Sequence, residues 1–97
     1  DDAGLYYISK MTNLKELYLQ KTKLDGSGLI YLQKLPNLEI LNLSFTQVDD
    51  KAALDLLKFP NLKKVFLYRT NTSKEVVDAL SKYKPELKIL LEEGPYF

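Results

Sequence analysis

The sequence has neither histidine nor cysteine among its 97 residues. Without histidine there is no Ser-His-Asp triad, and without cysteine there is no thiol nucleophile, thiolate zinc site or disulfide. The glycine-containing stretch Asp25-Gly26-Ser27-Gly28 lacks the Lys-Ser/Thr of a phosphate-binding loop and predicts a turn into a helix. We therefore expect a protein that is not an enzyme and that holds no metal or cofactor.

A strong charge of one sign and a long apolar run are also missing. Lys and Arg number 14 and Asp and Glu number 13, a formal net charge of +1. This balance lacks the basic footprint of a nucleic-acid-binding protein, so we expect no nucleic-acid partner. No run of 18 apolar residues occurs, so we expect no membrane insertion by this segment. The composition is that of one small globular domain.

What the sequence does contain is a repeat. The pattern Asn-Leu-x-x-(Leu/Val)-x-Leu begins at Asn13, Asn37 and Asn61, so it recurs at a constant interval. A fixed period of roughly 20–29 residues predicts a stack of similar units. Full repeats span residues 13–36, 37–60 and 61–85, whereas residues 1–12 match the second half of a repeat and residues 86–97 form an edge strand and tail. Because such stacks normally end in polar caps, we expect a fragment of a longer chain.

Each repeat predicts one strand and one helix. Leu17 and Leu19 alternate with polar or aromatic neighbours, which is typical of a half-buried strand. Leu29, Leu32 and Leu35 recur at helical spacing. The sequence therefore predicts an α/β right-handed solenoid, with short parallel strands on the concave face and short helices on the convex face.

The ends of the chain carry finer predictions. Met11 is expected to face inward from the first helix and Tyr83 from the last. Lys84 is one residue more than the repeat requires before Pro85, so we expect the register of the last strand to slip.

Three polar columns recur with the repeat, and each has a structural interpretation. Thr22, Thr46 and Thr70 have no repeating base beside them and predict hydroxyls bonded to buried backbone. The three Asn residues that open the repeats predict turns. Asp25, Asp49 and Ser73 stand at helix starts and predict N-caps rather than a calcium site. The third position carries Ser73 and no acidic residue elsewhere takes its place, which a cap allows.

The pattern L-x-L-x-x-T resembles the leucine-rich repeat family across essentially the whole chain. The family usually carries Asn or Cys where this sequence has Thr22, Thr46 and Thr70, and this variant is similar to one common in bacterial proteins. The resemblance implies protein–protein recognition through the concave sheet. It also implies a location in the bacterial envelope or outside the cell.

The concave face is where contact residues are expected, since strand residues that do not face the core point outward there. Exposed aromatic residues and Arg are typical of interface centres. The predicted contact residues are Tyr18, Lys21, Ile40, Phe45, Lys64, Phe66, Tyr68 and Arg69. Asn42 and Ser44 are expected to lie in the same outward rows.

The sequence thus favours a non-enzymatic protein-interaction module. Two alternatives stay open at this point. One is a structural or docking domain at the C-terminus of a larger, enzymatic or electron-transfer, bacterial protein. The other is a carbohydrate-binding domain, since aromatic faces stack on sugars.

Overall fold

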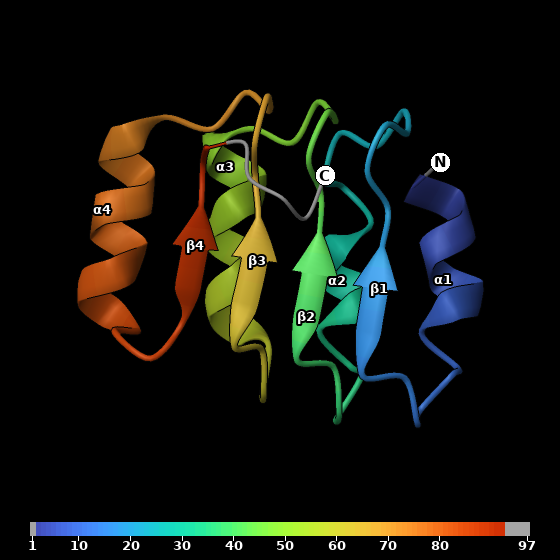
Figure 1. Cartoon of the computed structure of the whole chain (residues 1–97). Helices are drawn as coiled ribbons and strands as arrows, with labels where there is room; N and C mark the ends of the chain where they lie inside the picture. The colour runs from blue at the N-terminus through green and yellow to red at the C-terminus, as the bar shows by residue number, and fades with distance from the viewer. Residues whose placement is uncertain (1, 93–97) are drawn as a thin grey trace.

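The computed structural model describes residues 2–92, and helices alternate with strands along this part of the chain (Figure 1). The first repeat half forms a 3-10 turn, η1 (Asp2–Gly4), and a helix, α1 (Leu5–Ile8). The remaining elements follow in order: β1 (Glu16–Tyr18), α2 (Leu29–Leu32), β2 (Ile40–Asn42), α3 (Asp50–Ala53), the 3-10 helix η2 (Leu54–Lys58), β3 (Lys64–Phe66), α4 (Lys74–Tyr83) and β4 (Lys88–Leu90).

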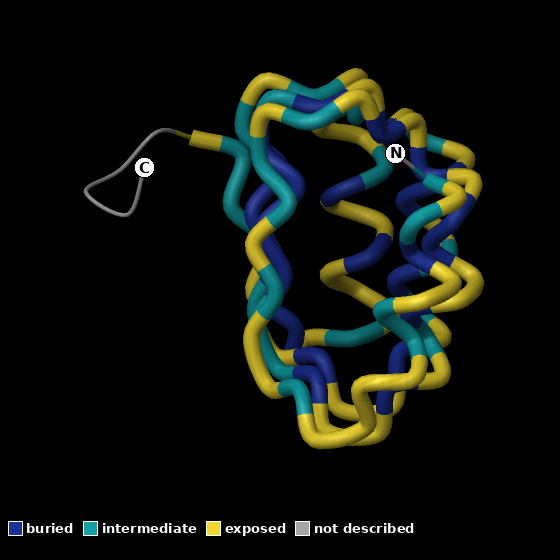
Figure 2. The backbone as a smooth tube through the Cα atoms, turned by 90° about the vertical axis from the view of Figure 1, so that its right-hand side faces the viewer, coloured by how far each residue is buried: buried dark blue, intermediate teal, exposed yellow. Residues whose placement is uncertain are grey.

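The four strands form one parallel sheet in the order β1-β2-β3-β4. Leu17 pairs with Leu41, Leu41 with Val65, and Val65 with Ile89, so each strand is displaced by one full repeat. When the stack is viewed along its axis from the α1 end, the turns of the backbone lie one behind another (Figure 2). Residues that correspond in successive repeats are therefore neighbours in space.

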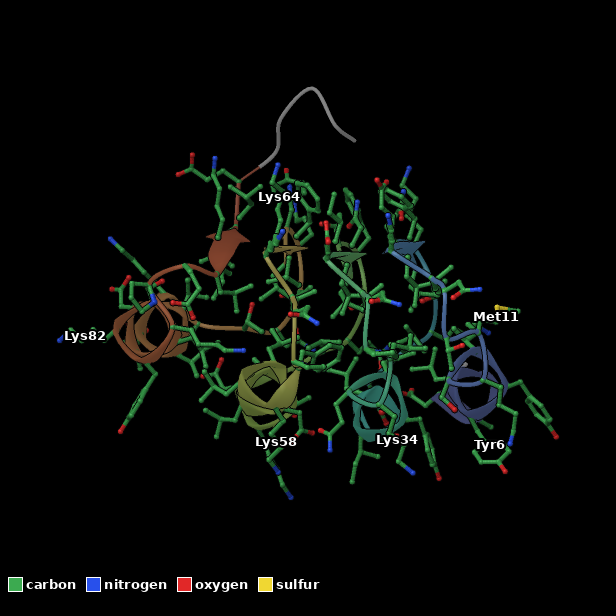
Figure 3. All side chains as sticks on the ribbon, turned by 90° about the horizontal axis from the view of Figure 1, so that it is seen from below. Tyr6, Met11, Lys34, Lys58, Lys64 and Lys82 are labelled. Carbon is green, nitrogen blue, oxygen red and sulfur yellow. The ribbon has the colours of Figure 1, made fainter. Side chains whose placement is uncertain are left out.

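The sheet forms one layer and the helices form the other. Figure 3 shows the helices spread more widely than the strands, so the sheet lies on the inner, concave side of the stack. This confirms the fold class that the repeat predicts, because short parallel strands are joined by short helices and stacked in sequence order.

The core lies between the two layers and is mostly leucine. Leu29, Leu32 and Leu35 are fully buried on the helical side, and they pack in one cluster with Leu41 and Leu43 of the sheet side. Burying a side chain of this size contributes about 1.5–3 kcal/mol relative to leaving it in water. The predicted inward positions of the complete repeats are thus confirmed for these residues.

Three predictions about the ends are wrong. Met11 is 57% exposed and Tyr83 is 80% exposed, because neither has a further helix layer to pack against. The register of β4 does not slip, since Lys64, Val65 and Phe66 pair with residues exactly one repeat later, Lys88 to Leu90. Lys84 is therefore not an additional residue: it stands exactly one repeat after Pro60, and Pro85 takes the position of Asn61.

The threonine column is structural, as predicted. The hydroxyls of Thr22, Thr46 and Thr70 donate to the carbonyl oxygens three residues earlier, at oxygen–oxygen distances of 2.7, 2.6 and 2.9 Å. Each bond closes the corner where the chain leaves a strand. Buried backbone groups need such partners, which explains why this column admits so little variation within the chain.

The asparagine column joins one repeat to the previous one. The Asn37 side-chain amide donates to the Thr12 carbonyl at 3.1 Å, and the Asn61 amide donates to the Pro36 carbonyl. At the end of the last repeat Lys84 takes this role, because its ammonium donates to the Phe59 carbonyl at 2.8 Å. Each donor stands 25 residues after its acceptor.

The helix starts are capped in two ways. Asp49 and Ser73 accept from the amides of Ala52 and Val76, which confirms the predicted N-caps. Asp25 instead accepts from the nearby Ser27 amide at 2.8 Å and does not cap α2, because that helix begins only at Leu29.

The acidic residue that serves this junction comes from the preceding repeat. The Asp2 carboxylate accepts from the amides of Asp25, Gly26 and Gly28 at 2.9, 3.2 and 2.9 Å. Asp50 repeats the arrangement two junctions later, where it accepts from the Ser73 amide and hydroxyl. The acidic column therefore holds neighbouring repeats together.

Candidate interaction surface

The surface of the sheet that faces away from the helices, here called the sheet face, carries the residues predicted to bind. Figure 3 shows Lys64 on this side and the helices on the other. Tyr18 of β1, Ile40 of β2, and Lys64 and Phe66 of β3 lie within the strands. Lys21, Phe45, Tyr68 and Arg69 lie just after them, where the strands end.

The corner residues of this face have an unusual backbone. Lys21, Phe45 and Arg69 adopt φ values of 62°, 59° and 57°, the left-handed region that side chains other than glycine rarely enter. These three residues are spaced by one repeat, so the same turn occurs after β1, β2 and β3. Each such residue costs roughly 1–2 kcal/mol of backbone strain. The turn aims three side chains in a similar direction from three successive repeats.

The corner side chains form one cluster with Tyr68. The rings of Phe45 and Tyr68 pack edge to face, with centroids 5.3 Å apart and planes at 80°. The Lys21 ammonium lies 5.4 Å from the Phe45 centroid, and the Arg69 guanidinium lies 5.8 Å from the Tyr68 centroid. These distances are typical of cation–π contacts. The structure thus brings together four of the eight predicted contact residues.

Tyr18 lies apart from that cluster, on the outermost strand. It is 53% exposed, and its hydroxyl donates to the Glu16 carboxylate at 2.7 Å. This hydrogen bond to Glu16, together with partial desolvation and the carboxylate charge, raises the pKa of Tyr18 above its ordinary value. The phenol is therefore held as a neutral, oriented group with one edge open to solvent.

Phe66 is not the exposed contact that the sequence predicts. It is 5% exposed, in a register row between Asn42 of β2 and Leu90 of β4. A residue in the middle of a concave sheet has neighbours on both sides, and the curvature brings their side chains together above the strand. Phe66 therefore forms the floor of the sheet face.

Asn42 and Ser44 are also buried, contrary to their expected outward exposure. Their side chains bond the backbone: the Asn42 carbonyl oxygen accepts from the Ser44 amide at 3.0 Å, and the Ser44 hydroxyl accepts from the Tyr68 amide at 3.1 Å. These bonds fix the turn that carries the aromatic cluster. Both residues are thus positioning residues for that cluster.

Ile40 and Lys64 are half-buried and lie side by side at the start of their strands, in register with Glu16 of β1. They border the buried floor at the opposite end of the strands from the aromatic cluster. The sheet face therefore has a buried floor, an aromatic and cationic border where the strands end, and a mixed border where they begin.

Two polar atoms of this region have no hydrogen-bond partner among residues 2–92. They are the Asn42 side-chain nitrogen and the Gln20 side-chain oxygen, and both are buried. Since buried polar groups are nearly always bonded, this donor and this acceptor represent hydrogen-bonding capacity that the described fold leaves unused.

The sequence prediction concentrated on the sheet and missed the helical side. Tyr6, Tyr7, Ile30, Tyr31 and Leu54 are all exposed there. A signal was present in the sequence, because Lys10, Lys34, Lys58 and Lys82 recur once in each successive repeat. The balanced net charge does not show this column.

Neither side of the described part shows the arrangement of a metal centre or a membrane span. Among residues 2–92, no three acidic side chains come together in a way that could hold a metal ion. No helix in the same range is long and apolar enough to cross a bilayer.

Comparison with known families agrees with the geometry. The pattern described as leucine-rich repeat matches residues 10–32 and 34–57, two consecutive repeats of this chain. The chain belongs to the leucine-rich repeat family. Leucine-rich repeat domains generally mediate protein–protein interaction and are typically not enzymes. A comparison with curated proteins finds no match to the chain as a whole.

Proposed function

We propose that this leucine-rich repeat domain is a non-enzymatic module that binds a protein partner through its sheet face. The observation that carries the proposal is the cluster of Lys21, Phe45, Tyr68 and Arg69 where the strands end. Tyr and Arg are the residues that most often dominate binding energy at protein interfaces. Family membership supports the same class of function.

The charge of the face indicates what kind of partner fits. Lys21, Lys64 and Arg69 contribute three positive charges, whereas Glu16 contributes one negative charge whose oxygen already accepts from Tyr18. Complementary charge accelerates encounter and selects partners. An acidic protein surface is therefore the favoured ligand.

The experiment is a pull-down from the source organism with two matched variants as baits. The site variant is Tyr18→Ala/Lys64→Gln/Arg69→Gln. The control is Tyr83→Ala/Lys51→Gln/Lys82→Gln, which removes the same number of tyrosines and positive charges from helices α3 and α4. We expect the wild-type domain and the control to retain a common protein that the site variant loses. Equal retention by both variants would contradict binding through this face.

A second role is favoured by the edge of the sheet at β1. Leu17 and Leu19 are only half-buried there, whereas the corresponding Leu41 and Leu43 are fully buried. Solenoid repeats bury such residues on a neighbour, so the β1 edge suits stacking against another parallel strand of a larger protein.

Amide hydrogen exchange tests this role. The Leu19 and Lys21 amides already donate to β2 and the residues that follow it, so the alternate Tyr18 and Gln20 amides face the open edge. These two amides should exchange more slowly in the full-length product of the source gene than in this domain, and equal rates would contradict the role.

A further inference from the structure

The helical side of the domain carries a line of lysines. Lys10, Lys34, Lys58 and Lys82 are each one repeat apart and are all exposed. Figure 3 shows Lys34 and Lys58 pointing away from the sheet on the outer side of the helices, with Tyr6 on the same side and Lys82 projecting at the α4 end. Because the repeats stack in register, the column becomes a continuous cationic line across the convex side.

An apolar line runs beside the lysines. Tyr6, Ile30 and Leu54 are each one repeat apart and stand four residues before Lys10, Lys34 and Lys58. These three side chains are 45, 49 and 49% exposed, and the neighbouring Tyr7 and Tyr31 are 72 and 36% exposed. The eight residues are here called the helical ridge: Tyr6, Tyr7, Lys10, Ile30, Tyr31, Lys34, Leu54 and Lys58.

The side chains of the ridge already contact one another. The Tyr6 ring packs edge to face on both Tyr7 and Tyr31, each with centroids 5.5 Å apart. The Lys10 ammonium lies 4.9 Å from the Tyr6 centroid. The tyrosines therefore form one block that spans α1 and α2, with a cation at its border.

The ridge is positive and nearly free of acid. The positions that Tyr7 and Tyr31 occupy in their repeats are taken by Asp55 one repeat later. The Asp55 carboxylate pairs with the Lys58 ammonium at 3.8 Å. In the fourth repeat Asp78 replaces the apolar residue, so the ridge ends before α4. Helix dipoles do not account for the lysine column, because α1 and α2 have only four residues each and neither has a basic residue in its last turn.

From these observations we propose that the helical ridge docks the domain peripherally on an anionic lipid bilayer. Tyrosine is enriched at the level of lipid headgroups, where its apolar ring and polar hydroxyl are both satisfied. Ile30 and Leu54 would enter the boundary of the acyl chains, and the lysines would remain at the lipid phosphates. This docking is separate from the sheet-face function and leaves that face turned away from the bilayer.

Other anionic surfaces fit the ridge less well. Nucleic acid would use the lysines and could stack on tyrosine, but it offers nothing to exposed Ile30 and Leu54. Protein interfaces are enriched in arginine and depleted in lysine, whereas every cation of the ridge is lysine and Arg69, the chain's one arginine, lies on the sheet side. Lysines beside aliphatic and tyrosine side chains are the composition of surface-lying membrane-binding segments.

The test is cosedimentation with vesicles of phosphatidylglycerol and phosphatidylcholine, with pure phosphatidylcholine vesicles as reference. The ridge variant is Lys10→Gln/Lys34→Gln/Lys58→Gln, and its matched control is Lys15→Gln/Lys23→Gln/Lys88→Gln, which has the same net charge but an intact ridge. Each lysine near an anionic surface contributes about fivefold to partitioning, so the ridge variant should bind about 100-fold more weakly than wild type. The control should stay close to wild type.

A second pair of variants tests the apolar line. Ile30→Ser/Leu54→Ser should weaken binding to the anionic vesicles by about tenfold or more, whereas Tyr83→Ser, at an exposed tyrosine outside the ridge, should not. These positions are exposed, so the variants are expected to fold. The proposal is overturned if wild type binds both vesicle types equally, if the control loses as much as the ridge variant, or if an oligonucleotide is bound and anionic vesicles are not.

Discussion

Replacing Thr46 by valine removes one hydroxyl from the most buried corner of the domain. Thr46 is 6% exposed, and its hydroxyl donates to the carbonyl of the fully buried Leu43 at 2.6 Å. Valine keeps nearly the same shape, so the variant deletes the hydrogen bond without creating a large cavity. It leaves the Leu43 carbonyl without that donor, in a place that water does not reach.

The expected loss follows from that burial. A buried polar group that loses its partner costs about 1–3 kcal/mol, so we expect Thr46→Val to lower the free energy of unfolding by about 2 kcal/mol. Thr22 and Thr70 are only half-buried, and Thr70 also lies 2.6 Å from the Thr72 hydroxyl. Water or Thr72 can compensate there, and we expect about 0.5–1 kcal/mol for each of these variants.

The assay is urea unfolding followed by circular dichroism, with thermal unfolding as a second readout. Each kcal/mol should lower the Tm of a domain of this size by about 4–8 °C. The control is Thr12→Val, at an exposed threonine, which should change stability by less than about 0.5 kcal/mol. If Thr46→Val is as stable as Thr12→Val, or if all three column variants lose the same amount, the reasoning from burial is refuted.

Three further predictions concern the backbone and pH. Lys21→Gly should raise the free energy of unfolding by about 0.5–1 kcal/mol by relieving the strain at φ 62°, whereas Lys23→Gly, which relieves no such strain, should not; a loss at Lys21 in denaturant unfolding would contradict this. Gly26→Ala should cost more than about 2 kcal/mol, because φ is 98° and the new Cβ would lie 2.3 Å from the Ala52 Cβ; an unchanged Tm would contradict the tight approach. The hydrogen bonds from the amide and hydroxyl of Ser27 lower the pKa of Asp25 below its ordinary value. Asp25 therefore stabilises the fold above the ordinary aspartate pKa of about 4 and loses this effect as pH falls through its lowered pKa. The stability difference between wild type and Asp25→Asn in urea titrations should shrink below about pH 4, and a constant difference would contradict the shift.

The fold was predictable because its signal is repeated. Every strand pairs with its neighbour at a displacement of one repeat, and Leu41 and Val65 are buried where the pattern places them. The wrong predictions of burial concern residues at the ends of the stack, which lack a neighbouring repeat on one side. Met11 and Tyr83 are exposed because the pattern describes an interior repeat, and a periodic sequence does not say where packing ends.

The surface was harder to predict because exposure depends on curvature and neighbours. Alternation along a strand places Phe66 and Asn42 on the sheet face, which is correct, but it does not show that adjacent strands cover them. The positive φ values at Lys21, Phe45 and Arg69 also leave no trace in residue type, since none of them is Gly or Asn. The lysine column on the helices could have been found by applying the same period to the basic residues.

The most direct test of the proposed function is photo-crosslinking from the sheet face. A benzophenone amino acid replaces Tyr18 in one protein and Tyr83 in another, since both positions are exposed and only Tyr18 lies on the sheet face. After irradiation in lysate of the source organism, we expect a specific protein to be captured at position 18 and not at position 83. Capture of the same proteins in equal yield at both positions, or capture at position 83 alone, would contradict recognition through the sheet face.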